Sequence, residues 1–218
     1  MFFVLHLIGS EVWEAIAIFN VMKKRIPCTG HALALAALIL AVGSAYAQSA
    51  PSKTVLHLDA SATTIHWTLK DILHTIHGTF RLKSGVVTLD ETTGGAEGEI
   101  IVEMASGESG NSARDRRMQK DVLESTKYPE AIFHPQKVTG VVRDGQTENV
   151  TVEGTFTIHG IDHPLFLQVK TTLNGKVLMA KTNFIVPYVA WGMKDPSTLM
   201  LRVGKTVQVD VDARATLQ

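Results

Sequence analysis

From Thr54 to near the end of the chain, apolar residues recur at every second position. Ile65, Trp67 and Leu69, for example, alternate with threonine and histidine. Because successive side chains of a β-strand point to opposite faces, this period predicts strands with one buried face. Short turn sequences separate the runs, so we expect eight or more antiparallel strands. The further runs fall at residues 76–82, 87–89, 98–104, 132–142, 149–158, 164–173, 176–186 and 205–213.

Turn sequences connect several runs, among them residues 159–160 (His-Gly) and 174–175 (Asn-Gly). The Asn-Gly pair predicts a two-residue hairpin turn in which both residues have positive φ. Many short antiparallel strands form a sandwich or a closed barrel, and a barrel is favoured because closure leaves no exposed strand edge. Gly78, Gly98 and Gly154 lie inside predicted strands, where glycine suits a bend or the close approach of a ligand.

One segment, residues 111–123, breaks the alternation and is rich in helix-forming residues. Asn111 or Ser112 can cap its first turn, and Met118 and Val122 lie four residues apart on one face. We therefore predict a short amphipathic helix between strands, which can cover one mouth of a barrel. Its charged face carries Arg114, Asp115, Arg117 and Asp121.

Residues 1–47 predict an N-terminal extension and a secretory signal peptide that lie outside the fold. After Met22, three basic residues precede an apolar stretch at residues 32–42 and an Ala-Tyr-Ala sequence at residues 45–47. This order is typical of a signal that is cleaved after the small residues. Residues 48–218 are then expected to form one domain.

The first 21 residues have no basic flank of their own and contain Glu11 and Glu14. One interpretation is that the start codon is assigned too early and that translation begins at Met22. The alternative, a second membrane segment, would have to bury both carboxylates in hydrocarbon, which is costly.

The charge balance of the expected mature domain excludes two classes of partner. Residues 1–47 hold three of the 21 Lys and Arg and two of the 21 Asp and Glu residues, so 18 basic and 19 acidic groups remain. A domain without net positive charge lacks the basic surface that nucleic acid or an anionic membrane requires. Cys28, the single cysteine, leaves with the prefix. The mature fold therefore has no disulfide and depends on apolar burial.

The histidines and serines are not spaced for catalysis. The histidines at residues 74, 77, 159 and 163 lie on predicted strands or turns, where a hydrogen bond to the backbone is a simpler role than metal binding. Residues 106–112 contain three serines but no Gly-x-Ser-x-Gly sequence, which a hydrolase elbow requires. They also lack the lysine of a phosphate-binding loop. We expect no catalytic residue, no metal and no cofactor.

Several stretches resemble the YceI-like family in their order and spacing: residues 74–80 (HTIHGTF), 106–111 (SGESGN), 114–118 (RDRRM), 127–133 (KYPEAIF) and 154–165 (GTFTIHGIDHPL). This resemblance covers about residues 55–213. It implies a lipocalin-like barrel of eight antiparallel strands, exported to the periplasm, whose elongated apolar cavity holds a polyisoprenoid and which has no established catalytic residues. Residues 186–196 resemble only a subset of the family, which leaves the cavity's length and mouth, and so the ligand's identity, open.

The predicted function is that of a non-catalytic carrier for a long-chain isoprenoid or another apolar lipid. Alternatives are a protein that sequesters apolar toxins or quinones and, less favoured, a periplasmic hydrolase; a homodimer also stays open. Arg114 is either a surface charge or points to the barrel mouth and meets a polar ligand head, with Asp115 or Glu108 beside it. The residues expected to bind the ligand are Trp67, Phe80, Val102, Met104, Arg114, Met118, Gly154, Phe156 and Phe184.

Overall fold

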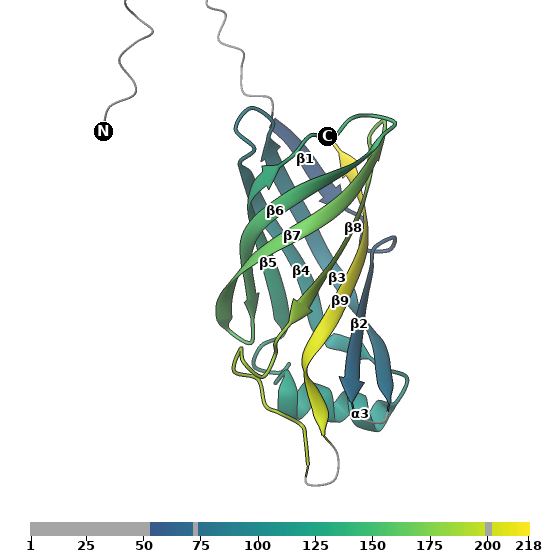
Figure 1. Cartoon of the computed structure of the whole chain (residues 1–218), viewed down its shortest axis with the longest axis vertical. Helices are drawn as coiled ribbons and strands as arrows, with labels where there is room; N and C mark the ends of the chain where they lie inside the picture. Colours follow the sequence, from purple (N-terminus) through teal and green to yellow (C-terminus); the bar gives the residue numbers. More distant parts are fainter. Residues whose placement is uncertain (1–52, 72–73, 199–201) are drawn as a thin grey trace, which may run out of the picture. The chain divides into compact units, whose positions relative to one another are not determined.

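The computed structural model describes residues 53–71, 74–198 and 202–218. Within these residues, nine strands pair antiparallel in one sheet that closes on itself as a barrel (Figure 1). The all-β barrel predicted from the alternation is therefore confirmed. The strands are β1 (Lys53–Leu58), β2 (Thr64–Asp71), β3 (Thr75–Asp90), β4 (Ala96–Glu108), β5 (Glu130–Thr139), β6 (Thr147–Ile158), β7 (Ile161–Asn174), β8 (Val177–Val186) and β9 (Val203–Leu217).

Strands β1 and β2 together occupy one position in the barrel wall. Both pair with β3 on one side and with β9 on the other, at successive levels along those two long strands. Between them, the Asp59 carboxylate accepts hydrogen bonds from the backbone N–H groups of Ser61 (2.9 Å) and Ala62 (3.2 Å). This Asx turn takes the chain out of the wall for a few residues. The nine segments therefore build the predicted eight-stranded barrel, with one strand interrupted.

Strand β3 is continuous where the sequence shows two separate apolar runs. Its register with β4 shifts between Leu82 and Ser84, as happens where a bulge adds a residue to one strand of a pair. The buried side chains consequently change from the even-numbered Leu82 to the odd-numbered Val87. The change of phase in the sequence thus marks a bulge and not the end of a strand.

The two hairpin turns singled out in the sequence differ in backbone conformation. Between β6 and β7, His159 and Gly160 have φ values of 53° and 74°, both positive as in a type I′ turn. Between β7 and β8, the prediction of positive φ at both Asn174 and Gly175 is wrong. Asn174 is the last residue of β7, and the loop consists of Gly175, with φ 59°, and Lys176. A positive φ at the first loop residue fits a type II′ turn, which favours glycine there.

The predicted helix is present in two parts. A single α-helical stretch, α3 (Ser112–Arg117), continues into one wide π-helical turn, η1 (Met118–Val122). The Asn111 side chain accepts hydrogen bonds from the backbone N–H groups of Ala113 (3.0 Å) and Arg114 (3.1 Å), which confirms Asn111 as the N-cap. Figure 1 shows α3 lying across one end of the barrel, near the end of β2. We call this the α3 end.

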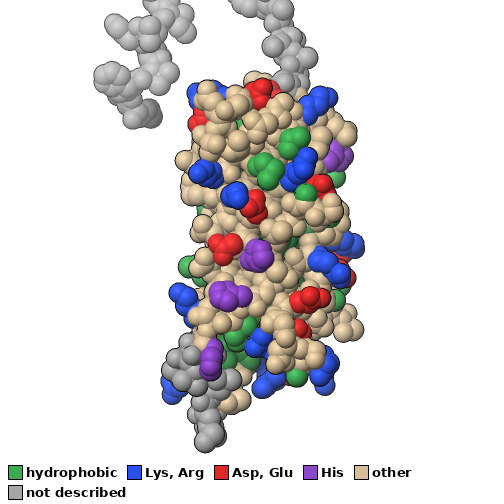
Figure 2. Space-filling model, turned by 90° about the vertical axis from the view of Figure 1, so that its right-hand side faces the viewer, with side chains coloured by type: hydrophobic (Ala, Val, Ile, Leu, Met, Phe, Trp, Pro, Cys, Tyr) green, Lys and Arg blue, Asp and Glu red, His purple; other side chains and the backbone are tan. Residues whose placement is uncertain are grey.

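Charged side chains of both signs are spread over the outer surface of the barrel (Figure 2). The alternation in the sequence therefore separates a polar outside from an apolar inside. Along the described parts of the chain, no helix is long and apolar enough to cross a membrane. The extension and signal peptide predicted at residues 1–47 lie outside the described residues.

Candidate functional site

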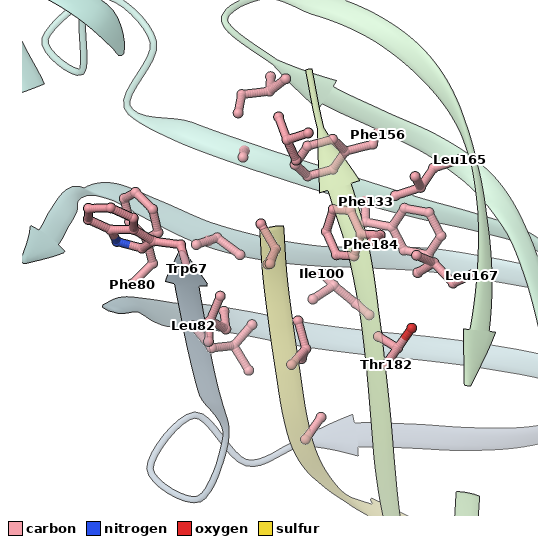
Figure 3. Close-up of a pocket in the computed structure, with 18 of the residues that line it drawn as sticks. Trp67, Phe80, Leu82, Ile100, Phe133, Phe156, Leu165, Leu167, Thr182 and Phe184 are labelled. Atoms are coloured by element: carbon pink, nitrogen blue, oxygen red, sulfur yellow. The ribbon is translucent and has the colours of Figure 1, made fainter. Parts of the chain in front are cut away.

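The inward faces of the strands enclose a cavity of about 480 Å³ (Figure 3). This volume falls in the range of about 300–1,000 Å³ that is common for small-molecule sites. Every strand contributes to its wall, and the lining is almost entirely aliphatic and aromatic. The polar side chains of the described lining are three threonines, one tyrosine and two arginines. Such a wall is suited to an apolar ligand that makes few hydrogen bonds.

The structure brings most of the predicted ligand-binding residues together around this cavity. Gly154 does not line it, although its position on β6 has the same parity as the inward-facing Phe156. A Cβ atom at Gly154 would lie 2.4 Å from the His134 carbonyl oxygen and 2.7 Å from the Phe133 ring. The space beside Gly154 is therefore occupied by β5 and is not open to a ligand. The predicted residues that do line the cavity are Trp67, Phe80, Val102, Met104, Arg114, Met118, Phe156 and Phe184.

Aromatic rings contact one another at two places in the cavity wall. The Phe156 ring meets the Phe184 ring edge-on at 6.0 Å between centroids and lies 6.1 Å from the Trp191 ring. On another part of the wall, Trp67 packs against Phe80 at 6.4 Å, and Figure 3 shows the two pairs of labelled rings well apart. Tilted and edge-on contacts are favourable geometries for aromatic pairs, so these contacts stabilise the wall around the cavity.

The connection from β8 to β9 folds back at the α3 end and contributes to the lining (Figure 1). Tyr188 and Met193 are buried there. The Tyr188 hydroxyl donates to a backbone carbonyl of β9 at 2.8 Å, and burial raises the pKa of this phenol to about 12. Trp191 stacks on the His163 imidazole with 4.0 Å between ring centroids, and burial lowers the pKa of His163. Sequence reasoning did not assign Tyr188, Trp191 and Met193 to the site, because they lie between the runs at residues 176–186 and 205–213, in a segment without alternation.

Arg114 reaches the cavity from α3, and Ser109 fixes its guanidinium. Its Nε–H donates to the Ser109 hydroxyl oxygen at 2.7 Å, and an Nη2–H donates to the Ser109 carbonyl oxygen, also at 2.7 Å. The Ser109 hydroxyl donates in turn to the Asp115 carboxylate. Asp115 is thus linked to Arg114 indirectly, through the Ser109 hydroxyl. Among the described residues, neither Asp115 nor Glu108 forms an ion pair with Arg114.

Among the histidines considered as catalytic or metal-binding groups, His77 and His159 have hydrogen-bond partners. The buried Nε2 atom of His163 has none among the described residues, and its ring stacks on Trp191. His159 Nε2 lies 2.7 Å from the Glu124 carboxylate, and His77 Nδ1 lies 3.1 Å from the Thr68 hydroxyl oxygen. The Ser106 hydroxyl donates to a backbone carbonyl of β4 (2.6 Å) and accepts a backbone N–H of β3 (2.8 Å). Figure 2 shows histidines apart from one another on the outer surface. In the parts of the chain that the structure describes, no three metal-ligating side chains lie together.

Gly154→Leu is expected to lower the free energy of unfolding by about 1–3 kcal/mol, because the added side chain must displace the Phe133 ring or the β5 backbone. The loss follows from the 2.4 Å and 2.7 Å contacts that even a Cβ would make. Equilibrium denaturation measures it, with the lipid content of the variant determined on the same preparation. An unchanged stability together with a reduced lipid content would instead place Gly154 at the ligand.

Comparison with known proteins agrees with this architecture. The YceI-like domain model matches residues 56–215. A polyisoprenoid binding domain from Saccharophagus degradans, implicated in plant cell wall breakdown, is 18% identical, with a TM-score of 0.61 over 75% of this chain and 98% of that one. Burkholderia cenocepacia BcnA is also 18% identical, with a TM-score of 0.61 over 73% of this chain and 99% of that one. At this identity the likeness shows a shared fold. No curated protein matches the chain.

Proposed function

Because the chain belongs to the YceI-like family, we propose that it is a non-catalytic protein that binds a long apolar lipid, such as a polyisoprenoid, inside the barrel. The observation that carries this proposal is the cavity, whose aliphatic and aromatic lining comes from every strand. A related fold described as a polyisoprenoid binding domain supports a lipid of this class. The barrel would shield such a lipid from water during transfer.

Apolar burial is large enough to hold such a ligand without a dense polar site. A chain that buries about 700 Å² of apolar surface gains roughly 17 kcal/mol at about 25 cal/mol/Å². Immobilising the ligand costs about 4–15 kcal/mol. The difference is favourable over the whole of this range, so the hydrocarbon wall can supply the affinity.

The non-catalytic role is supported by the polar groups that face the cavity. Among the described lining residues these are hydroxyls and guanidinium groups, without a carboxylate, a histidine or a cysteine. A hydroxyl nucleophile needs a general base beside it, and the carboxylates and imidazoles that most often serve as that base are missing from this described lining. A hydrolase would have to place its reacting groups elsewhere.

The place of action that we propose is the periplasm. It rests on the basic, apolar and Ala-Tyr-Ala segments between Met22 and Ala47, which have the order of a cleavable secretory signal. A lipid carrier in that compartment would hold its ligand in an aqueous space between membranes.

One experiment tests ligand and location together. The protein is purified from a periplasmic fraction without detergent, and its mass is measured under native and denaturing conditions. We expect a polypeptide that begins at Gln48 and an additional mass from one lipid, identified in an organic extract. A full-length cytoplasmic species would contradict export, and a purified protein that neither contains nor takes up an apolar lipid would contradict the carrier. A mixture of quinones or other apolar compounds would favour the sequestration alternative.

A further inference from the structure

The strands β7 and β8 are joined by hydrogen bonds over only part of their length. The ladder between them stops at Val169 and Thr182. Beyond it, among the described strands, residues 161–168 of β7 pair only with β6, and residues 183–186 of β8 pair only with β9. Figure 1 shows the two strands separating toward the α3 end. The sheet therefore has a break at this place in the barrel wall.

The two separated strand segments have apolar side chains on both faces. On the inner face, Leu165 and Phe184 line the cavity (Figure 3). On the outer face, Phe166 and Ile185 are 67% and 63% exposed, more than any other large apolar side chain in the described parts of the chain. Apolar groups therefore lie on the cavity side and on the outer side of the break.

Residues 187–193, which we call the flap, follow directly after β8 and fold as a unit. The Trp191 N–H donates to the Pro187 carbonyl oxygen and the Met193 N–H to the Tyr188 carbonyl oxygen, both at 3.0 Å. The Tyr188 hydroxyl donates to the Gly204 carbonyl oxygen of β9 at 2.8 Å. The flap is thus a preformed turn that is attached by covalent and hydrogen bonds to the β8 and β9 side of the break.

The flap reaches the β7 side of the break through ring and apolar contacts. The Trp191 indole stacks on the His163 imidazole of β7, with 4.0 Å between centroids and 9° between planes. A Cβ atom at Gly192 would lie 3.5 Å from the Ile161 side chain. Among the described residues, no hydrogen bond joins the flap to β7, and the buried Nε2 atom of His163 has no partner. The flap can therefore leave β7 without breaking a hydrogen bond.

Building on the proposed lipid-binding function, we propose that this break is a lateral port through which the apolar chain of the ligand enters and leaves the cavity, with the flap as its lid. The stacked Trp191 and His163 are the latch, and the flap turns about its attachment to β8 and β9. Residues 164–169 and 182–193, which border the port, contain no charged side chain. A hydrocarbon chain that crosses the wall here therefore desolvates no charged group, which a charged rim would make costly.

Trp191→Ala removes the latch and tests it through exchange rates. The probe is all-trans-retinol, a fluorescent isoprenoid alcohol, mixed by stopped flow with the delipidated protein that begins at Gln48 and released to phosphatidylcholine vesicles. We expect the association and dissociation rate constants both to rise at least about fivefold, because opening of a lid limits passage in both directions. Phe80→Ala is the control, since it removes a ring of the cavity wall that packs on Trp67. It should raise the dissociation rate constant alone.

A His163→Cys, Trp191→Cys double variant gives the opposite test. Residues 48–218 contain no other cysteine. The reduced variant lacks the latch and should exchange retinol as fast as Trp191→Ala. After loading with retinol, a short bis-methanethiosulfonate reagent joins the two thiols, as verified by intact mass, and release should slow at least about tenfold because the lid is held shut. The Trp191→Cys single variant treated with the same reagent should keep its fast release.

The outcomes separate the port from the carrier. An association rate constant that Trp191→Ala leaves at the wild-type value would overturn the port, and so would a release rate that cross-linking leaves unchanged. In both cases retinol still binds, so the proposed lipid-binding function stands. A wild-type protein that binds no retinol would contradict the proposed function and the port together.

Discussion

Ala180→Phe is expected to reduce the lipid that co-purifies with the protein by about tenfold or more. Ala180 faces the cavity from β8 and is paired with Thr171 of β7 and with Ala213 of β9. All three side chains are small and line the cavity, so they leave room at one level of the barrel. A phenylalanine there would fill that room. A tail that lost even a tenth of its roughly 17 kcal/mol of burial would bind about tenfold more weakly.

The stability of this variant separates obstruction from misfolding. Because the ring enters existing space, the free energy of unfolding of the lipid-free protein should change by less than about 1.5 kcal/mol. Asn183→Phe provides the matched control, since Asn183 is an exposed residue of the same strand. It should keep its full lipid content. A normal lipid content in Ala180→Phe would show that the ligand does not pass this level of the barrel.

Much of the fold could be predicted because a closed barrel has one inside and one outside. The alternation assigns the residues of each strand to two faces, and closure follows from the many short antiparallel strands. Two features were harder to see. The interruption between β1 and β2 depends on an Asx turn at Asp59, and the phase change after Leu82 is a bulge. Both are local departures from a ladder whose partner strand lies far away in the sequence.

The candidate site was predicted less completely, because sequence periodicity does not say what a neighbouring strand places beside a residue. Gly154 has the parity of an inward residue, yet the Phe133 ring of β5 fills the space next to it. The stacked rings of His163 and Trp191 join β7 to the connection between β8 and β9, where apolar and polar residues do not alternate. Arg114 could be placed on a helix but not oriented, because its direction depends on the Ser109 contacts.

Gly78→Val is expected to lower the free energy of unfolding by about 3 kcal/mol or more, since both backbone and ring contacts become too close. Gly78 is directly paired with Trp67 across β3 and β2. A Cβ at Gly78 would lie 2.3 Å from the Trp67 ring and 2.2 Å from the Glu108 carbonyl oxygen. The indole therefore occupies the space beside the glycine and is part of the cavity wall. Urea denaturation of the lipid-free proteins measures the loss.

Gly95→Val is the control for the loss of backbone freedom, because the nearest atom to a Cβ at Gly95 is the Thr93 hydroxyl oxygen at 3.2 Å. Its free energy of unfolding should stay within about 1 kcal/mol of the wild type. Adding Trp67→Ala to Gly78→Val should recover part of the lost stability, since it removes the ring contact but leaves the Glu108 contact, and a double-mutant cycle gives the coupling. If Gly78→Val unfolds at the wild-type urea concentration, the indole can move aside without cost. Gly78 would then not be what holds Trp67 in the wall.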